Sequence, residues 1–442
     1  MLFSSATFLF FYLPAVLLLC LVLRGWLRIF FLLLTSLLFY AWGEPAAIWL
    51  MVLSILIAYT GGMLMERFPE RRKAWLWLSA GILLAMLAYF KYAGMVVPGF
   101  RVALPIGISF YTFQAIAYAA DVYRGDIRAE KDPVQFGTFI SFYPQLIAGP
   151  IERYGDIRPQ MDHIGLSLEG LSEGARLFTI GLSKKLLLAN PMGQLWERLR
   201  LYPADNGILG NWLAIIAFAF QIYFDFSGYS DMARGLGRMI GVRFSINFNY
   251  PYTASSITDF WRRWHITLSS WFREYVYIPL GGNRKGLARQ MLNILIVWAL
   301  TGLWHGAHWN FVLWGLYYAA LLMAEKLFLL RWYAALPAMA AWFPRALTLF
   351  FVLVGWAIFA LTDFAAMGHL LRGMFSGALL GAQTGAYWRA YIPLLVFCAI
   401  ASIRWKPRLP AWAENLVLAG LFALCVAALA TQGFNPFLYF RF

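Results

Sequence analysis

Two imidazoles and two indoles stand close together in the stretch Trp304-His305-Gly306-Ala307-His308-Trp309-Asn310-Phe311, inside an otherwise apolar run. Ionisable groups at membrane depth are costly, so they are by default candidates for function. The stretch therefore indicates both the class of fold and the place of the site, provided that the surrounding chain is embedded in a membrane.

The composition supports that condition. Of the 442 residues, 62% are hydrophobic and 13% are charged, whereas a soluble domain has roughly 25% charged residues. Apolar runs long enough to span a bilayer recur along the chain, for example at 7–23, 46–65 and 311–329. We therefore expect an all-α polytopic membrane protein with about eleven to thirteen transmembrane or re-entrant helices.

Prolines and glycines are scattered through the apolar runs instead of being collected in linkers. Non-helical backbone at membrane depth must be buried in protein or line a wet cavity, so these residues predict broken or re-entrant elements. We expect one integral-membrane domain over residues 1–442, ending in a short aromatic tail at 433–442. The first apolar run has no basic n-region or cleavage site, so we expect it to remain as a helix.

Basic residues flank alternate apolar runs, as at Arg24, Arg28 and 67–73. By the positive-inside rule the amino terminus is predicted to lie in the periplasm. The net charge of +15 is then explained by cytoplasmic loops, and a nucleic-acid partner is not expected. A cationic mouth for a phosphorylated donor is compatible with the same charge.

Three polar islands interrupt the apolar pattern, at 104–152, 221–249 and 259–285. In hydrocarbon each polar group needs a partner, so these side chains either join helices or line a tunnel. Asp225 can pair with Arg234 or with a basic group elsewhere, and an ion pair that fixes helix packing is favoured over catalysis. The candidate tunnel or substrate-binding residues are Gln114, Tyr118, Gln145, Asp225, Ser227, Asn249, Trp304 and Asn310.

Aromatic and basic residues alternate in the third island, as is typical of a membrane interface. This island also contains His265, which a hairpin of elements can bring close to His305. A neutral imidazole with a pKa of about 6.5 is suited to take a proton from a hydroxyl group. There is no Gly-x-Ser-x-Gly elbow and no phosphate-cradling glycine loop, so a serine hydrolase or a nucleotide-driven machine is disfavoured. The three cysteines are far apart in the sequence and show no paired spacing, so neither a disulfide framework nor a metal site is expected: Cys20, Cys398 and Cys425.

Five segments carry a family resemblance: 104–114, 145–151, 224–231, 259–265 and 302–306. With them the chain resembles a membrane-bound O-acyltransferase (MBOAT) of the bacterial alginate O-acetylation type. The resemblance implies helices ringed around a central tunnel. It also implies that His305 is the catalytic histidine and that His265 is the second active-site polar residue, which helps to stabilise the oxyanion. His308 has no such counterpart and is expected to be structural.

The resemblance further implies a multi-pass protein of the inner membrane that uses acetyl-CoA as its acyl donor, with no bound cofactor. Basic residues near the cytoplasmic mouth are candidates to hold the CoA phosphates: Arg262, Arg263, Arg273, Arg284 and Lys285. The tail resembles a short motif of bacterial acyl relays, in which Tyr439 would accept the acyl group. A periplasmic SGNH-type acetyltransferase would then complete O-acetylation of an exopolysaccharide, as in alginate biosynthesis.

Two other functions remain open from the sequence. A direct lipid or cell-wall O-acyltransferase would use the same His305 but accept long acyl chains and need no periplasmic partner. A transporter or flippase would move its substrate without consuming an acyl donor.

Overall fold

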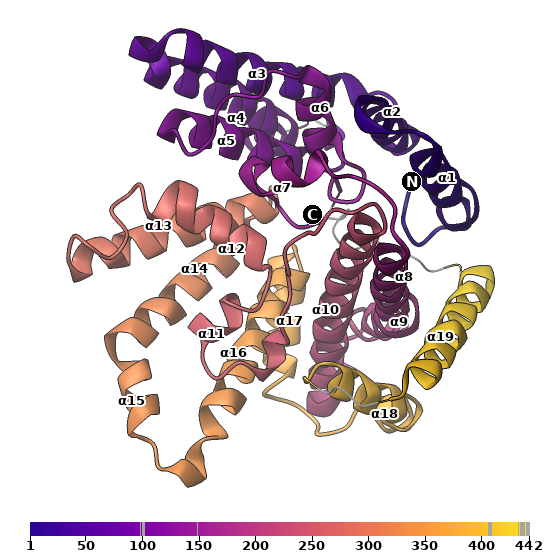
Figure 1. Cartoon of the computed structure of the whole chain (residues 1–442). Helices are drawn as coiled ribbons and strands as arrows, with labels where there is room; N and C mark the ends of the chain where they lie inside the picture. The colour runs from indigo at the N-terminus through magenta and orange to yellow at the C-terminus, as the bar shows by residue number, and fades with distance from the viewer. Residues whose placement is uncertain are drawn as a thin grey trace. The chain divides into compact units, whose positions relative to one another are not determined.

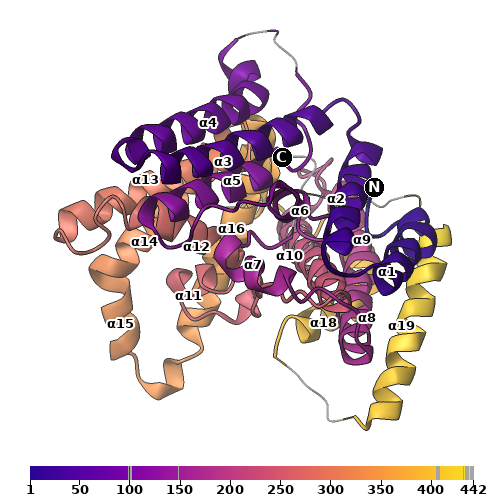
Figure 2. The same cartoon turned by 45° about the horizontal axis from the view of Figure 1, so that its top comes forward.

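The computed structural model describes residues 1–97, 99, 102–147, 149–404, 409–431, 433 and 438. Every regular element in these ranges is a helix (Figures 1 and 2). Nine helical segments of the described residues are long and apolar enough to cross a membrane, and the apolar helix Phe8–Val22 is shorter. The predicted all-helical, multi-pass class is therefore confirmed, whereas the exact number of spans stays a prediction.

The chain divides into two compact units, and neither is one continuous segment. Unit 1 comprises Met1–Leu182, Gly228–Ile246 and Leu421–Leu429, and unit 2 comprises Ser183–Ser227, Asn247–Gly420 and Ala430–Phe442. Helix α10 (Gly207–Met239) contributes its first part to unit 2 and its last part to unit 1. The single domain expected from the sequence stays a prediction.

Unit 1 is built mainly from the amino-terminal helices. Its elements before α10 are η1 (Phe8–Tyr12), α1 (Leu13–Val22), α2 (Gly25–Gly43), α3 (Ile48–Arg67), η2 (Pro69–Arg71), α4 (Arg72–Val96), α5 (Ile108–Arg124), α6 (Pro133–Ser141), α7 (Tyr154–Met161) and nearly all of α8 (Leu168–Ser183). Helices α3, α4 and α5 pack side by side, and α6 lies against α2 (Figure 1). The first polar island of the sequence, at 104–152, contains α5 and the short helix α6.

Unit 2 contains the elements that follow α8. They are η3 (Lys184–Ala189), α9 (Asn190–Leu199), η4 (Pro251–Thr253), α11 (Ile257–Trp261), α12 (Ile266–Phe272), η5 (Arg273–Tyr277), α13 (Leu287–His305), α14 (Trp309–Ala324), η6 (Glu325–Leu329), α15 (Leu330–Ala335), η7 (Ala338–Ala340), α16 (Phe343–Ala360), α17 (Phe364–Gly373), α18 (Thr384–Ala401) and the first part of α19 (Ala411–Thr431). Helix α14 packs against both α13 and α16. The hydrophobic core of unit 2 is rich in aromatic side chains, among them Phe260, Trp264, Trp314 and Trp356.

Two glycines allow α13 and α14 to approach closely. A Cβ atom at Gly302 would collide with the carbonyl oxygen of Phe311, and one at Gly315 would collide with that of Trp298. Small residues at such an interface let helix backbones pack tightly within a membrane. The close packing fixes the turn between the helices, which is the stretch that contains His305 and His308.

The third polar island forms short elements instead of a spanning helix. Helices α11 and α12 are five and seven residues long, and the π-helical turn η5 follows directly. Tyr250 and His265 are the non-glycine residues with positive φ in the described part of the chain, at 49° and 44°. Such left-handed residues are costly and are held in place by their surroundings, often at functional sites. The broken backbone expected here is therefore present.

Candidate active site

Both histidines of the predicted pair line one cavity of about 280 Å³ in unit 2. Its walls come from α11, α12, η5, α13, α14 and η6, and most of them are apolar or aromatic, including Trp261, Trp264, Leu268, Phe272, Ile294 and Trp298. A concave, mainly apolar site with a few polar groups is the usual form of a small-molecule site. The cavity can therefore hold an acyl group close to two imidazoles.

His305 is the last residue of α13 and is held between aromatic rings. Its ring lies edge-on to Trp314 and Phe359, at centroid distances of 4.9 and 5.2 Å. The following Gly306 has extended backbone, and a Cβ atom there would overlap the ring of Phe311. The Trp-His-Gly sequence thus ends the helix while aromatic packing holds the imidazole in place.

His265 is the N-cap residue directly before α12, and its side chain is buried. Its Nδ1 lies 3.1 Å from Oδ1 of Asn247, and the same oxygen accepts hydrogen bonds from the backbone N–H and the hydroxyl of Thr267. The Thr267 N–H can only donate, so it fixes which end of the Asn247 amide is oxygen. An amide oxygen only accepts, so Nδ1 of His265 must carry the proton.

This tautomer determines what His265 can do. Burial lowers the pKa of His265 to about 3, so its ring is neutral near pH 7. With the proton on Nδ1, Nε2 is a proton acceptor, and it has no hydrogen-bond partner within the described residues. The expectation that His265 stabilises an oxyanion therefore disagrees with the geometry, because a neutral ring in this tautomer has no N–H at Nε2 to donate.

Trp304 contacts both imidazoles. Its ring centroid is 6.0 Å from that of His265 and 5.0 Å from that of His305, and its side chain is buried. Asn310, which was predicted to line the tunnel, is fully buried and donates hydrogen bonds from Nδ2 to the carbonyl oxygens of Ile358 and Phe359. Asn310 thus joins the start of α14 to the end of α16.

The predicted phosphate-binding residues separate into two groups. Arg262 and Arg273 line the histidine cavity, where Lys326 adds a third basic group that was not predicted from the sequence. Arg263 instead pairs with Asp259 at 2.8 Å. Arg284 and Lys285 are exposed in the loop before α13.

Asp225 pairs with a basic group other than Arg234. Its carboxylate lies 2.6 Å from Nζ of Lys185, and both side chains are buried. Arg234 pairs with Asp231 at 3.1 Å. Of the two other candidates in this island, Ser227 is buried and Asn249 is exposed.

The three candidates in the first island belong to unit 1, and all three are buried. Gln145 donates from Nε2 to the carbonyl oxygen of Phe139 at 2.6 Å. The hydroxyl of Tyr118 accepts a hydrogen bond from the backbone N–H of Glu130 at 2.9 Å, and Gln114 lies on α5. Tyr118 therefore contributes to a polar cluster centred on Glu130.

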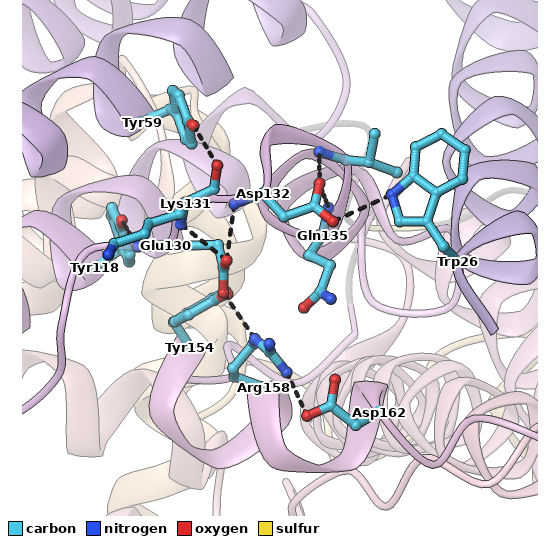
Figure 3. Close-up of polar contacts among 11 residues, drawn as sticks. Trp26, Tyr59, Tyr118, Glu130, Lys131, Asp132, Gln135, Tyr154, Arg158 and Asp162 are labelled. Atoms are coloured by element: carbon cyan, nitrogen blue, oxygen red, sulfur yellow. Dashed lines mark hydrogen bonds and ion pairs between the residues drawn. The ribbon is translucent and has the colours of Figure 1, made fainter.

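Glu130 organises the segment between α5 and α6 (Figure 3). Its carboxylate accepts hydrogen bonds from the backbone N–H groups of Lys131 and Asp132, from the hydroxyl of Tyr154 and from Nε of Arg158. These partners satisfy a carboxylate that is largely removed from water. The cluster fixes the loop in unit 1 and explains why so many polar residues occur in the first island.

Tyr439, the predicted acyl acceptor, lies outside the described residues. His308 is exposed just before α14. Within the described part of the chain, no three His, Cys, Asp or Glu side chains form a group that could hold a metal ion.

The fold and the cavity together define a class: a multi-pass membrane protein with two histidines on one mainly apolar cavity. The family model of the membrane-bound O-acyltransferases matches residues 127–367. The probable alginate O-acetylases AlgI of Pseudomonas putida and Pseudomonas aeruginosa are 36% and 34% identical to the chain, in alignments that cover 100% of both partners. The peptidoglycan O-acetyltransferase of Helicobacter pylori is 32% identical over 85% of this chain and 80% of its own.

The chain belongs to the membrane-bound O-acyltransferase (MBOAT) family. It is therefore an O-acyltransferase of the membrane, and the transporter alternative is set aside.

Proposed function

We propose that the protein takes an acetyl group from cytoplasmic acetyl-CoA and passes it across the inner membrane for O-acetylation of an exopolysaccharide. The observation that carries this proposal is the cavity that His265 and His305 share with Arg262, Arg273 and Lys326. The likeness to probable alginate O-acetylases supports a polysaccharide acceptor.

Acetyl-CoA matches the chemistry of the cavity. Its apolar walls suit the acyl group and the pantetheine arm, whereas guanidinium and ammonium groups suit phosphates through charge-assisted hydrogen bonds. The proposed phosphate-binding residues are Arg262, Arg273 and Lys326, because Arg262 and Arg273 are the members of the predicted set of five that line the cavity. The donor is a substrate, and no bound cofactor is required.

The transfer needs one base and one oriented hydroxyl. His305 takes the proton of the acceptor hydroxyl while the oxygen of that hydroxyl bonds to the acetyl carbonyl carbon. The carbon–sulfur bond then breaks, and the imidazolium returns the proton to the leaving thiolate. Before the transfer, the acceptor hydroxyl donates its one hydrogen to Nε2 of His265 and is oriented by this hydrogen bond, with Asn247 holding the ring. The same hydrogen turns to His305 when the hydroxyl oxygen attacks.

The first acceptor is the hydroxyl of Tyr439, at the carboxyl-terminal tail. A periplasmic SGNH-type acetyltransferase then moves the acetyl group from that tyrosine ester to the glycan. The amino terminus is proposed to lie in the periplasm, as the positive-inside rule predicts.

A second candidate is direct O-acetylation of the cell wall, which the likeness to the Helicobacter pylori peptidoglycan enzyme favours. In that case Tyr439 has no role, and the acceptor hydroxyl belongs to the wall polymer itself.

Purified protein in nanodiscs, given acetyl-CoA labelled in the acetyl group, tests the proposal. We expect release of free CoA and label on a carboxyl-terminal peptide, with the label absent in Tyr439→Phe. Use of a long-chain acyl-CoA in preference to acetyl-CoA would contradict the proposal that acetyl-CoA is the donor. Unchanged transfer by Tyr439→Phe would contradict the relay and favour the direct route.

A further inference from the structure

The buried Asp225 and Lys185 pair has a second partner near the end of the chain. The backbone N–H of Leu438 donates a hydrogen bond to Oδ2 of Asp225 at 2.8 Å, while Oδ1 lies 2.6 Å from Nζ of Lys185. One carboxylate thus joins α10, η3 and the carboxyl-terminal segment inside unit 2.

Leu438 is also held by apolar packing. Leu438 is 6% exposed, and its side chain belongs to the same hydrophobic core as Leu213, Phe224 and Trp314. A leucine side chain loses contact with water only where the surrounding residues leave room for it. The core of unit 2 therefore accommodates this residue of the tail, and Asp225 satisfies the amide that enters with it.

The charge pair explains why a carboxylate can lie there. An isolated buried carboxylate is costly, whereas one that has a cation and a backbone amide as partners is compensated. Lys185 supplies the cation, and the Leu438 N–H supplies the amide. When the tail is absent, Oδ2 loses this partner, so the pair favours an occupied site.

We propose that Asp225 and Lys185 form a docking site for the carboxyl-terminal segment of the chain, with Asp225 as a positioning residue that holds Leu438 by its backbone amide. The site recognises Leu438 by its backbone N–H and its aliphatic side chain. The docked residue directly precedes Tyr439. The link from docking to acyl transfer rests on the proposed function.

Docking is measured without any acyl donor. Leu438→Cys keeps the backbone N–H, and the three native cysteines, all buried, are replaced by alanine in the same protein. We expect N-ethylmaleimide to modify Cys at this position slowly when Asp225 is present. In Asp225→Ala the rate rises about tenfold or more, since a hydrogen bond to a charged group is lost.

Glu197→Gln is the matched control, because it breaks another ion pair of unit 2, that of Glu197 with Arg200 at 2.6 Å. It leaves the labelling rate slow. An equally slow rate in Asp225→Ala, in protein that elutes as wild type in size-exclusion chromatography, overturns the proposal.

A second pair of variants leaves Asp225 and Lys185 intact and covers the case in which Asp225→Ala does not fold. Leu438→Pro deletes the donor N–H, whereas Leu438→Ala keeps it. We expect faster hydrogen–deuterium exchange in the carboxyl-terminal peptide of the proline variant than in that of the alanine variant. Equal exchange contradicts the docking site. Both measurements are independent of acetyl transfer, so a failed relay through Tyr439 and a failed docking site give different results.

Discussion

Replacing Asn247 tests how the site controls His265. Asn247→Ala removes an oxygen that accepts hydrogen bonds from Nδ1 of His265 and from the N–H and hydroxyl of Thr267. Each buried donor left without a partner costs about 1–3 kcal/mol. The His265 N–H is such a donor, so the expected loss is about 1–3 kcal/mol in the free energy of unfolding.

The effect on turnover is larger than packing alone would cause. Without Asn247 the proton of His265 is free to move to Nε2, and the ring can no longer accept a hydrogen bond there. Proton transfer assisted by a positioned side chain contributes about 10²–10⁴-fold to a rate. We expect CoA release from acetyl-CoA in nanodiscs to fall by about 10²-fold in Asn247→Ala.

Asn247→Asp is the matched variant, because its carboxylate still accepts the same three hydrogen bonds. Its negative charge raises the pKa of His265 from the low value that burial gives it. A protonated ring cannot accept at Nε2, so turnover at high pH is retained and is lost as the pH falls through the new pKa. The reasoning is refuted if Asn247→Ala turns over like wild type, or if Asn247→Asp keeps the wild-type pH profile.

Three further predictions concern stability and donor binding. Burial raises the pKa of Glu152 from 4.5 to about 7, so its stabilising contribution is complete below pH 4.5 and is lost as the pH rises through 7. Denaturation followed across this window should show a decrease of about 3 kcal/mol in the free energy of unfolding, which Glu152→Gln should abolish; the same pH dependence in that variant would contradict the shift. Gly315→Ala should lower the stability by about 1–3 kcal/mol through overpacking, whereas Gly420→Ala, whose Cβ meets no atom within 4 Å, should leave the thermal midpoint unchanged. Arg273→Gln should raise KM for acetyl-CoA about tenfold or more, whereas Lys285→Gln should leave it unchanged. Equal effects of the two variants would contradict donor binding in the cavity.

Much of the fold could be predicted because bilayer thickness sets the length of apolar runs. The polar islands at 104–152 and 259–285 could be recognised as interruptions, and the structure has short helices there. The partition into two interleaved units could not be predicted, because it depends on contacts between segments far apart in the sequence. Helix α10, which contributes to both units, reads in the sequence as one apolar run followed by a polar island.

The site was predictable to the extent that chemistry is visible in single residues. His265 and His305 stand out because imidazoles are rare in this chain, which has five histidines. The roles of Asn247 and Lys326 could not be predicted from the sequence, because the role of an amide or an ammonium group depends on the atoms that it contacts in the folded chain. Arg263 shows the converse: it looks like a phosphate ligand beside Arg262, but Asp259 lies one helical turn away and pairs with it.

The central claim is that acetyl transfer takes place at the histidine cavity, and two neighbouring histidines test it most directly. His305 lines the cavity, whereas His308 is exposed three residues later. CoA release from acetyl-CoA is measured in nanodiscs for His305→Ala and His308→Ala, each checked for a monodisperse elution profile. The account predicts loss of release in His305→Ala and wild-type release in His308→Ala. Undiminished release by His305→Ala would contradict it.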